Sequence, residues 1–369
     1  MRIAPLSERV VGERLGHAIH DRRGRVLLAA GVTLTPRYVS VLRRRGYLSV
    51  PLFDPLAPDA VPLDVVRAEV RQHATAAIRE TLRQAVADGS VAPETLVQVV
   101  DQILDDLAVN PDLAYNVSCL RSLREYLFVH SVNVCVYALT VAEPLALERD
   151  QLRDLGVGAL LHDIGKIYYL ELVNKRGPLT PEEQAVIRRH TTDGYELLRR
   201  QAGIDLLSAH VAYQHHERLD GSGYPRARRG AQIHPWAQAA AVADVYDTIT
   251  ADRTYGKAIP PHEAMAEVWR QAEAGQLNRQ LVRQLMLRVA AYPEGTILAL
   301  ESGEIGVVVG QGRQGGDRPR VRVLADARRE PVAGGERIID AREPETTVRR
   351  VLADYPARLR RQLGDALLA

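Results

Sequence analysis

The sequence predicts a mainly α-helical protein that carries a small β-rich module at each end. Through the middle of the chain, apolar residues recur every three or four positions, which is the period of a helix. Short apolar runs separated by glycines fill the first fifty-odd residues, and similar runs follow Tyr292-Pro-Glu-Gly295. With 369 residues, the chain is long enough for two or three domains and at least one sizeable core.

Residues 1–58 are expected to form the first β-rich module, which contains one helix. Its apolar runs, Arg25–Leu28 and Leu48–Leu52, are as short as typical strands. Thr35-Pro36 is typical of a helix start. The proline-rich stretch from Pro51 to Pro62 marks the end of the module.

Residues 59–112 are expected to form a helical connector. Gly89 ends its first helix, and Pro93 stands where the first turn of the second helix tolerates proline. The apolar faces of the two helices comprise Val66, Val70, Ala74, Ile78 and Leu82, and Leu96, Val100, Ile103, Leu104 and Leu107. The first of these faces has two alternative uses, a dimer interface between two copies of the chain or packing within its own domain.

The pattern stays helical over residues 113–290, with loops near residues 174–180, 203 and 219–230. Residues 291–369 are expected to form a second β-rich module that ends in a helix over Tyr355–Leu368. Its predicted strands are Thr296–Leu300, Ile305–Val309 and Arg320–Leu324.

Charge and cysteine content narrow the class of protein. The chain has 48 basic and 46 acidic residues, and this balance argues against a partner that is a nucleic-acid polymer and against a polybasic membrane protein. Cys119 and Cys135 are its two cysteines, which is too few for a disulfide framework and fits a reducing cytosol. No apolar stretch approaches the roughly 18 residues of a membrane helix, and charges interrupt the first sixteen residues where a signal peptide would be apolar. We therefore expect a cytoplasmic protein without membrane contact.

Histidines gather in the helical middle of the chain, where seven of the eleven lie between residues 130 and 234. His162-Asp163 is followed by Ile-Gly-Lys, and His215-His216 by Glu-Arg-Leu-Asp-Gly-Ser-Gly-Tyr-Pro. Imidazole and carboxylate ligands without thiolate favour iron, manganese, cobalt, nickel or zinc over copper(I) or an iron–sulfur cluster. A carboxylate can bridge two ions, and two such ions can hold a hydroxide for phosphoryl displacement.

These motifs closely resemble those of the HD-GYP family of metal-dependent phosphodiesterases. The segments that match are His162–Lys166, His215–Pro225, His130-Ser131, Leu179–Glu183 leading to His190, and Ala243–Asp247 followed by Arg253. They cover about residues 113–290, and the ordered set is far more specific than the His-Asp pair alone. The resemblance implies the helical bundle of the HD superfamily for this part of the chain.

The resemblance also implies two divalent metal ions, with iron or manganese expected. One ion would be bound by His130, His162, Asp163 and Asp244, and the second by Asp163 as the bridge with His190, His215 and His216. Some relatives bind a third ion through a glutamate four residues before the first histidine. Tyr126 stands at that position here and Glu125 lies one step away, so we expect two ions.

Further roles carry over to single positions of the resemblance. Asp163 and Lys166 are the expected catalytic residues, and Lys166 would also face the substrate phosphate. It is one of three lysines in the chain, the others being Lys175 and Lys257. Substrate contacts are expected from Lys166, Gly223, Tyr224, Pro225 and Arg253, with the ring of Tyr224 stacked on a base.

One departure from the family pattern concerns phosphate binding. After Arg253 the family has a second basic residue where this chain has Gly256, and Lys257 follows one position later. Other polar residues receive no ligand role in our interpretation. We expect Arg218 and Asp220 to hold the Gly221–Pro225 loop in shape, and His210 and His234 to lie outside the metal centre.

The activity implied by the resemblance is hydrolysis of cyclic di-GMP to pGpG, and further to GMP in some members, by a hydroxide that bridges two metal ions. Two alternatives remain. One is a signalling adaptor that binds cyclic di-GMP, or a diguanylate cyclase (GGDEF) protein through the GYP loop, without turnover. The other is a phosphodiesterase for another cyclic dinucleotide or nucleotide. The complete ligand set favours an enzyme, whereas Gly256 favours the adaptor.

Overall fold

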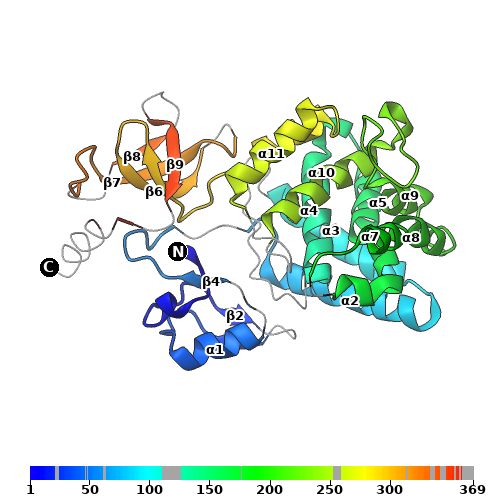
Figure 1. Ribbon diagram of the computed structural model, residues 1–369, viewed down its shortest axis with the longest axis horizontal. Helices are drawn as coiled ribbons and strands as arrows, with labels where there is room; N and C mark the ends of the chain where they lie inside the picture. Colours follow the sequence, from blue (N-terminus) through cyan, green and yellow to red (C-terminus); the bar gives the residue numbers. More distant parts are fainter. Residues whose placement is uncertain are drawn as a thin grey trace. The chain divides into compact units, whose positions relative to one another are not determined.

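The computed structural model divides the chain into two compact units (Figure 1). Met1–Asp64 and Val289–Ala369 contribute to the first unit, and Val65–Pro111 and Leu123–Arg288 to the second. The structure describes residues 1–20, 25–45, 47, 49–60, 64–109, 126–175, 177–251, 259–312, 315–332, 337–340, 346–352, 355–356 and 359.

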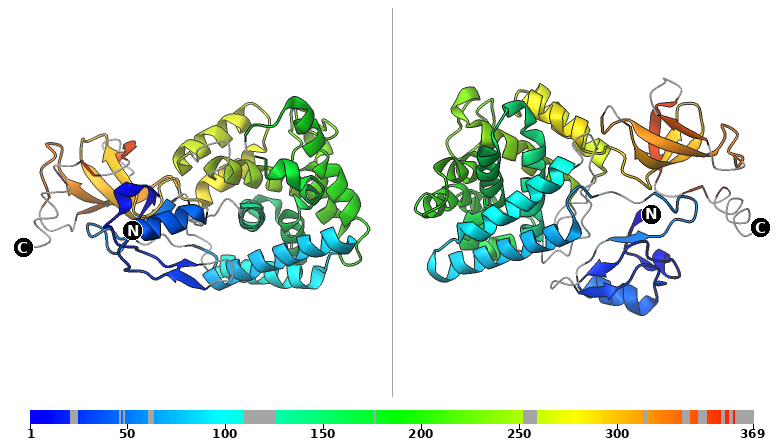
Figure 2. Two further views of the ribbon diagram at one scale, coloured as in Figure 1. Left: turned by 60° about the horizontal axis from the view of Figure 1, so that its bottom comes forward. Right: turned by 180° about the vertical axis from the view of Figure 1, so that it is seen from behind.

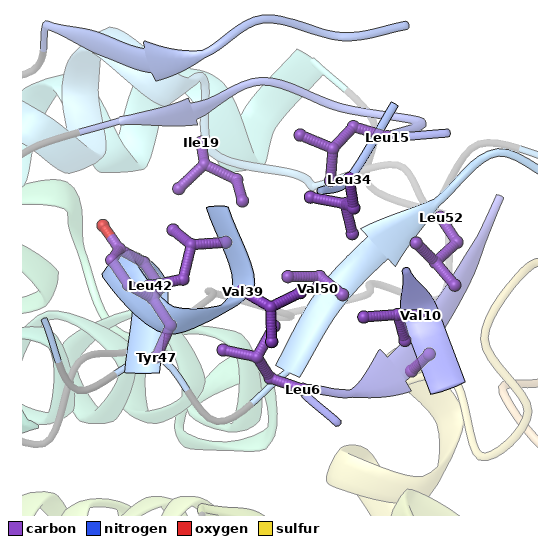
Figure 3. Packing of buried hydrophobic residues seen from close by; sticks show 11 residues of the cluster. Leu6, Val10, Leu15, Ile19, Leu34, Val39, Leu42, Tyr47, Val50 and Leu52 are labelled. Carbon is purple, nitrogen blue, oxygen red and sulfur yellow. The ribbon is translucent and has the colours of Figure 1, made fainter. Parts of the chain in front are cut away.

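The N-terminal part of the first unit is β-rich with one α-helix, as the sequence predicts. Strand β1 (Arg2–Pro5) pairs antiparallel with β4 (Ser49–Leu52), and β2 (Ile19–His20) pairs with β3 (Val26–Leu28). A short 3-10 helix, η1 (Glu8–Val10), follows β1. Helix α1 (Pro36–Arg44) begins after Thr35, whose hydroxyl accepts from the Tyr38 backbone N–H. The apolar core between these elements is shown in Figure 3.

The C-terminal part of the first unit is an antiparallel sheet with the strand order β8-β7-β6-β5-β9. Its strands are β5 (Ile297–Leu300), β6 (Ile305–Gln311), β7 (Pro319–Ala325), β8 (Ile338–Asp340) and β9 (Val348–Leu352). The first three match predicted strands. The edge strands β8 and β9 were not predicted, because β8 has only three residues and two arginines interrupt the apolar residues of β9. Most of the expected closing helix lies outside the described residues.

A segment from the N-terminal part of the chain packs onto this sheet. Ala57 and Ala60 are buried in the same apolar cluster as Ile305. Arg322 on β7 forms a two-pronged ion pair with Asp59, with N–O distances of 2.7 and 2.6 Å. These contacts join residues from both ends of the chain within the first unit.

The second unit is a bundle of helices and short 3-10 turns. Its α-helices are α2 (Ala68–Asp88), α3 (Pro93–Val109), α4 (Tyr126–Val141), α5 (Arg149–Leu160), α6 (Leu170–Val173), α7 (Pro181–Ile187), α8 (His190–Leu198), α9 (Leu206–Gln214), α10 (Pro235–Thr250), α11 (Pro261–Glu273) and α12 (Arg279–Arg288). The 3-10 helices are η2 (Glu143–Leu145), η3 (Ile164–Tyr169) and η4 (Gly230–Gln232). Helix α4 contacts α2, α5, α10 and α12, so it lies at the centre of the bundle (Figures 1 and 2).

The connector helices belong to this bundle. Val70, Ala74 and Ile78 on α2 are buried, and α2 packs against α3 and α4. The apolar stripe predicted on α2 therefore packs within its own unit. Gly89 ends the helix with φ of +75°, a conformation that glycine adopts without steric cost. No helix among the described residues is both long and apolar enough to span a bilayer.

Close helix approach aligns the ends of α5 and α9. A Cβ atom on Gly158 of α5 would lie 2.9 Å from the backbone of Ser208 on α9, so only glycine allows this contact. His162 lies two residues after the end of α5, and His215 directly follows the end of α9. The packing of these two helices thus brings two histidines of the sequence motifs to one place.

Candidate metal centre

All seven predicted ligand positions meet in the second unit, at the ends or on the inner faces of five helices. His130 lies on α4, His190 opens α8 and Asp244 lies on α10, while the other four follow α5 and α9. Six of the seven are buried, and the side chain of His216 keeps 18% of its surface exposed. We call these residues the metal centre: His130, His162, Asp163, His190, His215, His216 and Asp244.

Asp163 lies in the middle of the metal centre and faces two separate pairs of histidines. Its Oδ1 is 3.3 Å from Nε2 of His190 and 3.7 Å from Nε2 of His215. Its Oδ2 is 3.4 Å from Nε2 of His162 and 3.7 Å from Nε2 of His130. Each carboxylate oxygen thus has its own pair of imidazoles, which is the arrangement that a carboxylate bridging two cations requires.

Asp244 contacts two histidines of the centre, one with each carboxylate oxygen. Its Oδ1 is 3.2 Å from Nε2 of His130, and its Oδ2 is 3.7 Å from Nδ1 of His216. The hydroxyl of Thr248, one turn later on α10, donates to Oδ1 at 3.2 Å. This bond holds the carboxylate toward the histidines.

Backbone carbonyls fix the orientation of three imidazole rings. Nδ1 of His162 donates to the carbonyl of Ala159, and Nδ1 of His190 donates to that of Ile187, each at 2.7 Å. Nδ1 of His215 donates to the carbonyl that precedes it by three residues at 3.0 Å. A carbonyl can only accept, so the proton lies on Nδ1 and the lone pair of Nε2 faces the centre.

The converging donor atoms fit bound cations. Nε2 of His130 lies 3.2 Å from Nε2 of His162, and Nε2 of His190 lies 3.5 Å from Nε2 of His215. Such facing lone pairs repel one another unless a positive charge lies between them. Oδ1 of Asp163 is also buried without a hydrogen-bond donor of regular geometry among the described residues. Both observations are satisfied by divalent metal ions.

The protonation states of the centre also suit metal binding. Burial lowers the pKa of His215 to about 4 and holds the pKa of His216 well below its usual range, so both rings are neutral near pH 7. Burial alone would raise the pKa of Asp163, but the positive charge of Lys166 outweighs it and keeps that pKa well below its ordinary value. The carboxylate therefore stays ionised.

Lys166 lies beside the centre on the Oδ2 side of Asp163. The 3-10 helix η3 carries it three residues after Asp163, and its Nζ donates to Oδ2. Its side chain keeps 23% of its surface exposed. A positive charge is therefore placed at the edge of the metal centre, where a bound anion could reach it.

The Gly-Tyr-Pro loop covers another edge of the centre. The ring of Tyr224 stacks on His216 with centroids 4.6 Å apart and an interplanar angle of 29°. The guanidinium of Arg188, just before α8, lies 4.9 Å from the centroid of the same ring. A Cβ atom on Gly223 would overlap backbone atoms of His216 and Arg218, so this position needs glycine.

The chain is similar to several known proteins. Residues 107–281 match the family described as "HD domain". The chain is 36% identical over 257 residues to the cyclic di-GMP phosphodiesterase PA4108 of Pseudomonas aeruginosa, covering 69% of this chain and 61% of the relative. It is 41% identical over 156 residues to the cyclic di-GMP phosphodiesterase response regulator RpfG of Xanthomonas campestris, covering 42% of this chain and 41% of the relative. Residues 107–281 are thus similar to an HD domain, and the chain is similar to these cyclic di-GMP phosphodiesterases.

A relative with a different printed specificity also matches. The chain is 34% identical over 158 residues to the 3'3'-cGAMP-specific phosphodiesterase 1 of Vibrio cholerae, covering 42% of this chain and 36% of the relative. The chain thus spans less than two thirds of the length of each of these three relatives.

A buried acid beside the Gly-Tyr-Pro loop was not assigned a role from the sequence. Glu217 is 2% exposed and accepts from the backbone N–H groups of Arg226 at 2.8 Å and Arg228 at 2.9 Å. It therefore fixes the backbone just after the Gly-Tyr-Pro motif. Its place directly after the two histidines was the available signal.

Other polar residues lie where the sequence suggested or outside the described part. Arg218 donates to the carbonyl of His215 at 3.2 Å, and Asp220 accepts from the Ser222 N–H at 2.9 Å, so both shape the loop. His234 caps α10 by accepting a hydrogen bond from the Trp236 N–H, and His210 lies beside Tyr195. Neither histidine is among the clustered residues that could hold a metal ion. Arg253, Gly256 and Lys257, together with Glu125 and the side chain of Tyr126, fall outside the described residues.

The contact made by the other ring nitrogen of His130 was also missed. Its Nδ1 donates to Oδ2 of Asp247 at 2.8 Å. Asp247 appeared in the sequence only as the last residue of the Ala243–Asp247 motif. Its position three residues after Asp244, on the same face of α10, could have indicated that it points toward the centre.

Proposed function

We propose that this chain hydrolyses a cyclic dinucleotide, with cyclic di-GMP as its preferred substrate, at a centre of two divalent metal ions. The observation that carries this proposal is the division of the Asp163 carboxylate between two histidine pairs. The printed activities of PA4108 and RpfG support the choice of substrate.

Two sets of residues would hold the ions, with Asp163 shared between them. The first set is His130, His162, Asp163 and Asp244, and the second is Asp163, His190, His215 and His216. The absence of thiolate among these ligands suits iron or manganese. Bound divalent ions supply an acidic water as the nucleophile and positive charge that stabilises the phosphate oxygens during displacement.

The chain's own residues would bind and orient the substrate. Lys166 would stabilise the charge that grows on the phosphate oxygens, since its ammonium group already lies at the edge of the centre. Tyr224 is held between His216 and the guanidinium of Arg188, so a guanine base would stack on its ring in the place that Arg188 now takes. Arg253 is our further candidate for phosphate binding.

The reaction balances without any other reactant. Water adds to phosphorus, the bond from phosphorus to the ribose 3′-oxygen breaks, and that oxygen takes a proton. The product of one such step on cyclic di-GMP is linear pGpG. A second hydrolysis of the remaining internal phosphodiester would give two molecules of GMP.

The test is anaerobic turnover of cyclic di-GMP by the full chain loaded with Fe(II) or Mn(II), with pGpG and GMP separated by chromatography. We expect turnover by the wild-type chain and none by a His162→Ala, Asp163→Ala double variant. Binding of two ions without turnover of any cyclic dinucleotide would overturn the proposal. In that case binding of cyclic di-GMP or of a diguanylate cyclase, without catalysis, becomes the function to test.

A second substrate deserves the same assay, because one relative is named as specific for 3'3'-cGAMP. The metal centre acts on the phosphodiester and not on the base, so it does not select between guanine and adenine. We expect a higher kcat/KM for cyclic di-GMP than for 3'3'-cGAMP. The reverse ratio would assign this chain to the second substrate.

A further inference from the structure

A buried chain of hydrogen bonds joins α2 to the metal centre. Nη1 of Arg71 on α2 donates to Oδ1 of Asn133 on α4 at 2.9 Å. Nδ2 of Asn133 donates to Oδ1 of Asp247 on α10 at 2.9 Å. The other carboxylate oxygen of Asp247 accepts from Nδ1 of His130 at 2.8 Å. Three helices thus contribute to one connection that ends on a metal-centre residue.

Every member of this connection is buried. Arg71 is 7% exposed, Asn133 and Asp247 are 0% exposed, and His130 is 2% exposed. Burial of a guanidinium and a carboxylate is costly, and an apolar pair of similar volume would commonly be as stable or more stable. The presence of two such groups in the bundle core therefore calls for a role besides stability.

The chemistry of each residue fixes which group donates and which accepts at each hydrogen bond of the connection. A guanidinium can only donate and a carboxylate can only accept, so the group between them must accept on one side and donate on the other. The amide of Asn133 does both, and its orientation is thereby set. Asp247 in turn keeps the His130 proton on Nδ1 and leaves Nε2 directed at Asp163 and Asp244.

We propose that Arg71 is a positioning residue for the metal centre, acting through Asn133 and Asp247 to hold the ring of His130. This inference rests on the proposed function in one respect, that the centre binds metal. It goes beyond the proposed function because it gives α2 a part in metal binding. Arg71 belongs to none of the sequence motifs and precedes Asn133 by 62 residues.

The experiment compares Arg71→Met with Arg83→Met in the full chain. Arg83 lies on the same helix but is exposed and pairs with Glu80, so its variant controls for loss of an arginine from α2. Binding of Co(II) is followed by visible absorption in competition with a chelator, which gives an affinity for each of the two ions. We expect Arg71→Met to lower the affinity for one Co(II) ion by about 10–100-fold and to leave the affinity for the other ion unchanged.

A purely structural role predicts a different result. A general loosening of the bundle would lower the affinity for both ions together and lower the melting temperature. A positioning role would lower only the affinity for the ion bound by His130. Unchanged affinity for both ions, or an equal loss for both, would overturn the proposal. Arg83→Met should bind both ions as the wild type does.

A second set of variants keeps the test informative if Arg71→Met folds poorly. Arg71→Lys keeps a buried donor and should lose less affinity for that ion than Arg71→Met. Asn133→Ala should lower the affinity for the same ion. The Arg71→Lys, Asn133→Ala double variant should lose no more affinity than Asn133→Ala alone, because both residues act through one connection. Additive losses would contradict that connection.

These outcomes separate the inference from the proposed function. If the wild-type chain binds no Co(II), the metal centre itself fails. If it binds two ions and Arg71→Met binds both equally well, only the role of Arg71 fails. Neither measurement uses a nucleotide, so the identity of the substrate does not affect the result.

Discussion

The apolar core of the N-terminal module and the metal centre of the helical unit both exclude solvent, but they bury opposite kinds of side chain. In the module, Leu15, Leu34 and Leu42 are at most 1% exposed and belong to one apolar cluster (Figure 3). In the helical unit, His162 and Asp163 are 0% and 3% exposed. Each buried leucine contributes about 1.5–3 kcal/mol to stability, whereas buried ionised or polar groups cost stability unless they are partnered.

This contrast shows which buried residues serve the fold and which serve chemistry. The leucines need only shape and apolar surface, so other apolar residues of similar volume could replace them. Metal binding by the histidines and aspartates of the centre depends on where their individual nitrogen and oxygen atoms lie. Substitutions in the apolar core of the module should therefore lower stability alone, whereas substitutions in the metal centre should lower metal binding.

The largest effect is expected from Asp163→Ala, which removes the carboxylate shared by both ligand sets. We expect the content of bound metal to fall from two ions per chain to less than one, and turnover of cyclic di-GMP to fall by about a thousandfold or more. Metal analysis after gel filtration and the chromatographic assay measure the two effects. A variant that keeps two ions would show that Asp163 is not the bridge.

A smaller effect, confined to the substrate, is expected from Gly223→Ala. The added Cβ would overlap backbone atoms of His216 and Arg218, so the loop must shift and Tyr224 with it. We expect KM for cyclic di-GMP to rise by about tenfold with the metal content unchanged, equivalent to about 1.4 kcal/mol of binding. Ser222→Ala, at the exposed neighbouring position, is the control. Equal kinetics for Gly223→Ala and the wild type would contradict the assigned role of the loop.

The module should respond to Leu42→Ala in stability alone. Leu42 is 1% exposed, and truncation of such a residue costs about 2–5 kcal/mol because it leaves a cavity. We expect calorimetry to show earlier unfolding of the first unit, while Co(II) affinity stays as in the wild type. Val26→Ala, at a position 57% exposed, should change neither quantity. A loss of metal affinity in Leu42→Ala would refute the separation of the two regions.

The smallest effect concerns Cys135 on α4, in the helical unit. Burial raises the pKa of its thiol, so the reactive thiolate is scarce at mildly alkaline pH and the sulfur is shielded. We expect no labelling of the Cys135 peptide by iodoacetamide in the native chain and full labelling in guanidinium chloride, measured by mass spectrometry. Rapid native labelling would mean that the core around α4 opens readily.

The elements that sequence reasoning located well are those with local signals. Thr35-Pro36 starts α1, Gly89 ends α2 and Pro93 starts α3, because capping and backbone angles depend on neighbouring residues. Strands β8 and β9 carry no such signal. They form because neighbouring strands accept and donate their backbone hydrogen bonds, and the residues that do so are distant in sequence.

For the metal centre, the sequence alone shows which residue types are available and in what order, since the His162-Asp163 and His215-His216 motifs resemble those of the HD-GYP family. Only the tertiary structure decided which oxygen of Asp163 faces which histidines, and that Arg71 and Asn133 connect to His130 through Asp247. The His130–Asp247 bond joins residues 117 positions apart. Such contacts are set by how helices pack, which depends on the summed burial of many side chains and not on any short motif.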